Sequence, residues 1–262
     1  MRKENVRNRF YGGHMNRSTA SLDHGAHIEH ADLRAISFHH VRFPGLELVD
    51  VEITGHIENL TINGVDIGPL VDAELNRRMP ERAKMNPTTV EEFQEAWAIL
   101  ERLWAETEER ARRLPSERLH EQVRDEWSFI ETLRHLGFAS AAWAGRMVLG
   151  DPVPWHPLDL PWDEAPGWDG IPWDREARPS LDEVLAVRRK RQAMVRDIIE
   201  GLTPEQLETT VTMTEPGWPQ LEDFPLRQCL FIVVNEEWHH RLYAERDLDA
   251  LDATTAATEG EN

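Results

Sequence analysis

Three capping boxes divide the chain after residue 88 into helices. Each box places a serine or threonine three residues before a glutamate, and the two side chains then satisfy backbone N–H groups at a helix start. The boxes are Thr89/Glu92, Ser128/Glu131 and Ser180/Glu183. They predict helices over about 89–113, 128–149 and 180–200. A fourth helix is predicted to start at Pro225 and to fade near Leu248.

These four helices predict a mainly α fold with a four-helix bundle over residues 88–250. The connection between the second and third helices is long, running from Asp151 to Pro179. A connection of this length is usually functional or packed as a lid. It is rich in proline and holds four tryptophans, Trp155, Trp162, Trp168 and Trp173, which favours packing over disorder.

A different pattern, with a period of five, begins at Ala26. Its third column is apolar throughout and holds Ile28, Leu33, Phe38, Phe43, Leu48 and Ile53. Neither a helix nor a simple strand has this period. The pattern resembles pentapeptide-repeat proteins, which implies a short right-handed β-helix. We assign residues 26–78 to this β segment, including a hairpin turned by Asn63-Gly64.

The remaining segments are predicted to be irregular. Residues 79–87 are assigned as a linker, and residues 1–25 and 251–262 as disordered tails.

Composition restricts the partners of the chain. It has 48 acidic and 29 basic residues, a net charge of −19, which argues against a nucleic-acid surface and against docking on anionic lipid. The single cysteine, Cys229, excludes an intrachain disulfide and a cysteine-based zinc site. No secretory signal or membrane span is recognised, so a cytoplasmic protein is expected.

The strongest functional signal lies in the fourth predicted helix. At 100° per residue, Cys229, Ile232, Glu236, His240 and Tyr243 fall within about 80° of one another. A carboxylate and an imidazole on an otherwise apolar face need partners, because burying either alone is costly. A divalent metal ion would satisfy both.

His135, in the second predicted helix, is the third candidate ligand, because small residues on its face could leave a cavity. A site made of His135, Glu236 and His240 would bind Zn²⁺ or a similar ion and keep coordination positions open. The same spacing also fits ordinary ion pairs on a helix surface. Cys229 is better explained as a buried core thiol. The histidines near the N-terminus, His24, His27, His30, His39 and His40, look like a metal cluster, but His27, His30, His39 and His40 occupy outward-facing places of the five-residue repeat and are better explained as solvated side chains. His239 is an alternative ligand, although an ion pair at the surface explains it better.

From about Ser128 to Asp247 the sequence resembles the DinB/YfiT-like family of metal-binding four-helix bundles. The stretches that carry the resemblance are Glu126-Trp-Ser-Phe-Ile-Glu-Thr-Leu-Arg-His135-Leu and Asn235-Glu-Glu-Trp-His-His240-Arg-Leu-Tyr. The family pattern has one histidine on the second helix and His-x-x-x-His on the fourth. His135 and His240 match the first and last ligands, whereas Glu236 stands where the family has histidine.

The resemblance implies a mononuclear divalent-metal site, with Zn or Ni as the expected ion. It also implies a thiol-dependent S-transferase or a hydrolase that acts on a small molecule, with mycothiol as a candidate co-substrate. Specific catalytic residues are not assigned, and a homodimer is left open. The alternative hypothesis is a non-catalytic metal-binding or scaffold protein with a degenerate site.

Overall fold

The structure, a computed structural model, describes residues 37–259 except 56, 125, 164, 169–170, 213–217 and 220–222, with side chains up to residue 253. The chain divides into two compact units, residues 1–60 and 61–262. This division lies upstream of the predicted linker at 79–87. The predicted tail over residues 1–25 lies outside the described residues.

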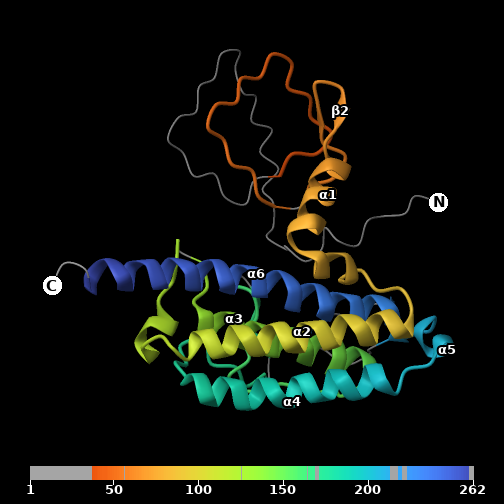
Figure 1. Ribbon diagram of the computed structural model, residues 1–262. Coiled ribbons are helices and arrows are strands. Elements are labelled where there is room, and N and C mark those ends of the chain that lie inside the picture. The colour runs from red at the N-terminus through yellow and green to blue at the C-terminus, as the bar shows by residue number, and fades with distance from the viewer. Residues whose placement is uncertain are drawn as a thin grey trace. The chain divides into compact units, whose positions relative to one another are not determined.

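The second unit is mainly helical (Figure 1). Its elements are β1 (Thr61–Ile62), β2 (Val65–Asp66), α1 (Gly68–Arg78), η2 (Pro80–Lys84), α2 (Val90–Ala111), η3 (Ser116–His120), α3 (Phe129–Ser140), η4 (Ala141–Val148), α4 (Leu181–Glu200), α5 (Pro204–Leu207), β3 (Thr210–Thr212), β4 (Asp223–Pro225) and α6 (Leu226–Glu259). None of the helices formed by the described residues is long and apolar enough to cross a membrane.

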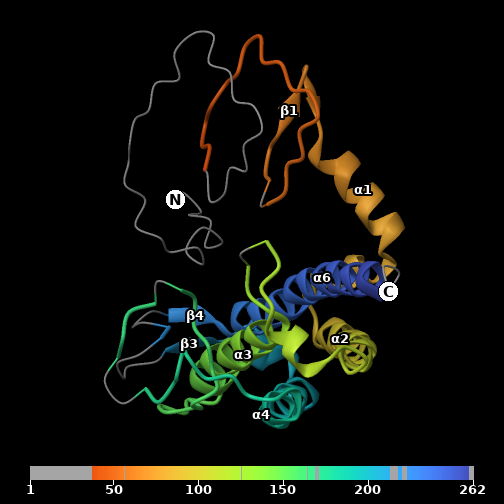
Figure 2. The ribbon, with the colours of Figure 1, turned by 90° about the vertical axis from the view of Figure 1, so that its left-hand side faces the viewer.

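The long helices pack in a ring in which each contacts two others. Helix α3 packs against α4 and α6, and α2 packs against the same two helices from the other side (Figures 1 and 2). Helix α3 continues directly into η4, a π-helix that also contacts α6. The core between them is apolar and includes Trp104, Leu133, Leu136, Leu185 and Leu248.

All three predicted capping boxes are formed. Thr89, Ser128 and Ser180 each accept a hydrogen bond from the backbone N–H of the glutamate three residues later. Each glutamate in turn accepts one from the backbone N–H of its capping residue. The starts of α2, α3 and α4 are therefore fixed by local hydrogen bonds that the sequence reveals.

The segment before α2 differs from the prediction in part. The hairpin is confirmed: Ile62 pairs with Val65, and the turn residues Asn63 and Gly64 both have positive φ. Residues 68–78, assigned to the β segment, instead form α1. Gly68-Pro69 begins this helix with a proline in its first turn, where the missing N–H costs nothing.

Helix α6 also extends further than predicted. It runs to Glu259, into the segment 251–262 that was assigned as a disordered tail. The reason is tertiary contact: Leu251 is buried, its carbonyl accepts a hydrogen bond from Arg118, and Arg110 pairs with Asp252 at 2.6 Å. Packing against α2 and η3 thus stabilises a stretch whose composition is typical of disorder.

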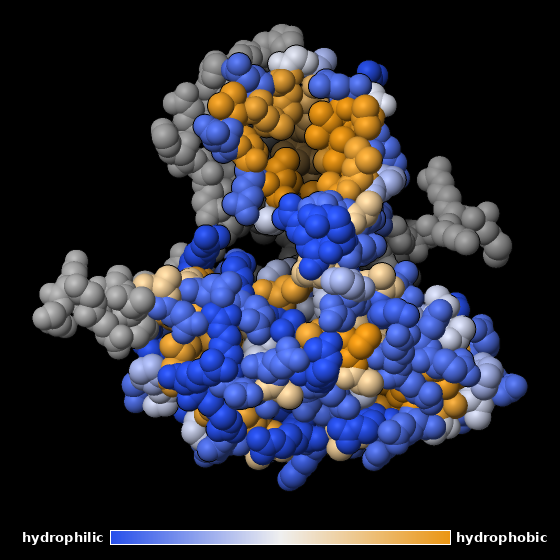
Figure 3. All heavy atoms as spheres, viewed as in Figure 1, coloured by the Kyte–Doolittle hydropathy of each residue, from blue (hydrophilic) through white to orange (hydrophobic). Residues whose placement is uncertain are grey.

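The described part of the first unit, 37–55 and 57–60, contains no helix or strand. Its apolar residues other than Leu60 are exposed, among them Phe38, Val51 and Ile53 at 54–62%, and apolar side chains gather on the surface of this unit in Figure 3. Phe38 and Phe43, one repeat apart, meet edge to face with their ring centroids 5.4 Å apart. The β-helix stays a prediction.

Candidate metal centre

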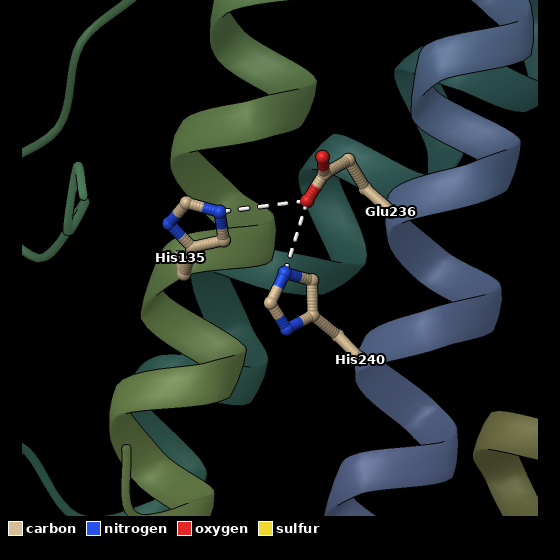
Figure 4. A group of neighbouring side chains, drawn as sticks. All are labelled: His135, Glu236 and His240. Carbon is tan, nitrogen blue, oxygen red and sulfur yellow. Dashed lines mark ion pairs between the residues drawn. The ribbon is translucent and has the colours of Figure 1, made fainter. Parts of the chain in front are cut away.

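Helices α3 and α6 bring the three predicted ligands together. Figure 4 shows His135 on α3 facing Glu236 and His240, which lie one turn apart on α6. Oε2 of Glu236 lies 3.0 Å from Nε2 of His240 and 3.5 Å from Nε2 of His135. One ligand atom from each residue lies within 4.8 Å of the other two. This is the only such group of three among the described residues.

The three side chains are largely removed from solvent. The exposed fractions of the His135, His240 and Glu236 side chains are 11%, 17% and 22%. The three side chains are thus shielded from most bulk water, although each keeps some accessible surface.

The hydrogen bond made by Nδ1 of His135 determines the role of the other ring nitrogen, Nε2. Nδ1 lies 2.9 Å from the carbonyl oxygen of Leu160. Because a carbonyl only accepts hydrogen bonds, Nδ1 carries the hydrogen. In the neutral ring Nε2 then carries no hydrogen, and its lone pair points at the carboxylate of Glu236.

Burial and charge act on the two partners in different ways. Burial lowers the pKa of His135, although the carboxylate of Glu236 opposes this shift. Burial alone would raise the pKa of Glu236, but the interactions with the imidazoles of His135 and His240 outweigh burial and hold that pKa below its usual range. The site is therefore an ionised carboxylate beside the Nε2 lone pair of His135 and the imidazole of His240, which suits a divalent cation of the Zn²⁺ or Ni²⁺ type.

Aromatic side chains surround the imidazoles. The ring centroid of Trp127 lies 4.4 Å from that of His135 and 5.9 Å from that of His240. Phe138 contacts His135 from the next turn of α3, and Tyr243 contacts His240 edge to face. These rings give the site low-polarity walls, in which charge interactions are stronger than in water.

The long connection packs against α3, beside the site. Phe138 contacts Trp155, Trp162 and Trp173, with centroid separations of 5.6–6.1 Å. Nε1 of Trp127 donates to Asp163 of the same connection at 3.0 Å. The prediction that this tryptophan-rich segment is packed is therefore correct for its described residues.

Other candidate residues lie outside the group. Cys229 is fully buried, and burial raises its pKa to about 12, so it has little thiolate character. His239 is exposed and is not part of the cluster. His39 and His40 are exposed as well, and His24, His27 and His30 lie outside the described residues.

Two features of the site were not predicted from the sequence. The carbonyl of Leu160 gives no sequence signal, because every residue has one. Trp127 immediately precedes the capping residue Ser128, and a tryptophan at that position could have been recognised as covering the first turns of the helix.

Comparison with known proteins identifies a family. A family model described as the DinB superfamily matches residues 99–244, more than half of the chain, and this interval includes His135, Glu236 and His240. Neither the curated proteins nor the solved structures contain a match.

Proposed function

We propose that this chain, which belongs to the DinB superfamily, holds one divalent metal ion between His135, Glu236 and His240. The observation that carries the proposal is the convergence of two imidazole nitrogens and one carboxylate oxygen within 4.8 Å. Without a cation, the lone pair of His135 would face an anionic oxygen at 3.5 Å. A metal ion replaces that repulsion with two coordinate bonds.

The reaction that we propose is metal-assisted activation of a thiol or of water for transfer to a small electrophile. The ion would act as a Lewis acid and lower the pKa of a thiol or water bound at an open position. The chain supplies the remainder: Leu160 orients His135, Glu236 neutralises one positive charge, and the rings of Trp127 and Phe138 limit access of bulk water. A thiol such as mycothiol, with Zn or Ni, is the expected combination.

The helical ring suits this role. We propose that α2, α3 with η4, α4 and α6 form a four-helix bundle whose core carries the site between two facing helices, as metal-binding bundles do. The long connection between η4 and α4 then closes one side of the site.

A metal assay tests the proposal. The full chain is purified without a histidine tag, and its Zn and Ni content is measured with and without prior treatment with a chelator. One equivalent of metal is expected in the parent protein and none in His135→Ala or His240→Ala. His239→Ala is the matched control, because it removes an adjacent imidazole from the exposed face. Full occupancy in either ligand variant would contradict the assignment.

A second candidate function is that of a scaffold. The observation in its favour is the exposure of the apolar residues of the first unit, from Phe38 to Ile57 at 45–69%, since contiguous exposed apolar surface commonly marks an interaction site. A protein of this kind would form a homodimer or bind a partner through that unit and would hold no metal. A metal-free parent chain in the assay above would favour it.

A further inference from the structure

The orientation of His135 depends on a single backbone carbonyl. The bond from Nδ1 to the oxygen of Leu160 turns Nε2 toward Glu236 and His240. Groups that hold the second nitrogen of a ligand histidine usually control its tautomer and its strength as a ligand. The placement of Leu160 therefore helps to determine how well His135 can bind a metal ion.

Arg134, the neighbour of His135, holds the turn that carries this carbonyl. Its Nε donates to the carbonyl of Leu158 at 2.9 Å, while its own carbonyl accepts from the N–H of Leu160 at 3.3 Å. Its terminal nitrogens donate to carbonyls further along the same connection, those of Asp174, Arg175 and Ala177. Arg134 is almost completely buried, so one side chain holds two separate parts of the connection against α3.

Gly137 allows the turn to approach α3 closely. Oδ1 of Asp159, the residue between Leu158 and Leu160, would lie only 3.0 Å from a β-carbon added at Gly137. Asp159 is 1% exposed, and its Oδ2 accepts from the N–H of His156 and faces Arg191 at 3.4 Å. Oδ2 is thus held by two partners, which limits how far the carboxylate can move away from a new methyl group.

We infer that Arg134 and Gly137 are positioning residues of the metal site: they hold the carbonyl of Leu160 against His135 and thereby fix the tautomer that presents Nε2 as a ligand. The inference deepens the proposed function and rests on it for the metal. The contact between α3 and the turn also exists without metal, so it can be tested separately.

The first test measures the tautomer of His135 in the metal-free full chain. Nitrogen NMR distinguishes Nδ1–H from Nε2–H imidazole, and the signals of His135 are assigned by their absence in His135→Ala. The parent protein and Gly167→Ala should show Nδ1–H alone. Gly167 is a matched control, because it lies in the same connection and a β-carbon there would meet nothing within 4 Å.

Gly137→Ala and Arg134→Lys should each introduce the Nε2–H form. Lysine keeps the charge of Arg134 but lacks the planar fork that reaches several carbonyls. Alanine favours a helix over glycine by about 1 kcal/mol, so loss of helix stability would not account for an effect of Gly137→Ala. An Nε2–H tautomer in the parent, or Nδ1–H alone in both variants, would overturn the inference.

The second test measures the affinity for Zn²⁺ by competition with a chromogenic chelator. Changes to groups that orient a ligand typically weaken metal binding about 10- to 100-fold, and we expect losses of this size for Gly137→Ala and Arg134→Lys but none for Gly167→Ala. Unchanged affinity in both variants would also overturn the inference. If the parent binds no Zn²⁺, the proposed function fails, and the tautomer measurement alone decides whether these residues position His135.

Discussion

Arg188 donates a hydrogen bond to each carboxylate oxygen of Glu237, at 3.0 and 2.6 Å, and both side chains are almost completely buried. The guanidinium also lies over the ring of Trp104, 4.4 Å from its centroid. The preceding residue, Glu236, faces the two imidazoles instead. The two adjacent glutamates on α6 therefore have different partners: Glu237 pairs with Arg188 in the core, and Glu236 contacts the imidazoles of the candidate site.

This division predicts that Glu237→Gln destabilises the protein. Removing one member of a buried ion pair costs about 3–5 kcal/mol, and Glu108, 3.9 Å from Nε of Arg188, is then the carboxylate that still faces the guanidinium. Urea unfolding of the metal-free protein measures the loss. Glu208→Gln is the control, because its pair with Arg227, at 3.7 Å, is exposed and should contribute about 1 kcal/mol or less. Equal costs for the two variants would contradict this account.

Cys229 should be chemically inert in the folded protein. It is fully buried, and burial raises its pKa to about 12. Since the thiolate is the reactive form, a disulfide reagent such as DTNB should modify the native chain far more slowly than the chain in urea. Rapid modification under native conditions would mean that the thiol is accessible and could contribute to chemistry.

The starts of the helices could be predicted because their signals are local. A capping box needs only residues within one turn, so Thr89, Ser128 and Ser180 mark α2, α3 and α4 correctly. The end of α6 could not be predicted, because it depends on contacts of Leu251 and Asp252 with residues more than 130 positions away.

The same distinction between local signals and distant contacts applies to the candidate site. The pairing of Glu236 with His240 follows from helical spacing, and the choice of His135 followed from the resemblance and from the small residues around it. Its contact with Leu160 depends on how a proline-rich connection folds back over α3, and no spacing rule describes that. Side chains on regular helices are predictable in register, whereas backbone groups in long loops are not.

The ionisation of Asp159 should make the stability of the protein depend on pH. Burial raises its pKa to about 6, against the opposing charges of Arg191 and Arg134. The native state thus favours the protonated acid. The stability that this preference contributes is fully present below the unfolded pKa near 4, and it is lost as the pH rises from there through about 6. Asp159→Asn removes this dependence.

Unfolding free energies at pH 5 and pH 7.5 test this point. The stability of Asp159→Asn relative to the parent should increase with pH, by roughly 1.4 kcal/mol for each unit of pKa shift that is expressed in this interval. Burial also lowers the pKa of His156, but this residue is present in both proteins and its contribution largely cancels. A difference that does not change with pH would mean that Asp159 ionises normally.

Glu236→Gln should give the opposite result to Glu237→Gln. Glutamine keeps the shape of Glu236 but not its charge, so it is a weaker ligand for a divalent ion, and Zn²⁺ affinity should fall. The unfolding free energy of the metal-free protein should change less than in Glu237→Gln, because the side chain of Glu236 is 22% exposed and that of Glu237 is 2% exposed. Glu237→Gln should keep Zn²⁺ affinity for as long as it is folded.

Glu236→His completes the series, because it restores the family pattern of three imidazoles. It should retain the metal, and it removes one negative charge beside the ion, so a bound thiol or water should ionise at lower pH than in the parent. Chelator competition measures the affinity for Zn²⁺. The ionisation is measured by adding a low-molecular-weight thiol to the Zn²⁺-loaded protein and following the pH dependence of the alkylation of that thiol. If Glu236→Gln binds Zn²⁺ as tightly as the parent, Glu236 is not a ligand. Two imidazoles alone are then too few for a tight mononuclear site, and the scaffold hypothesis becomes the better one.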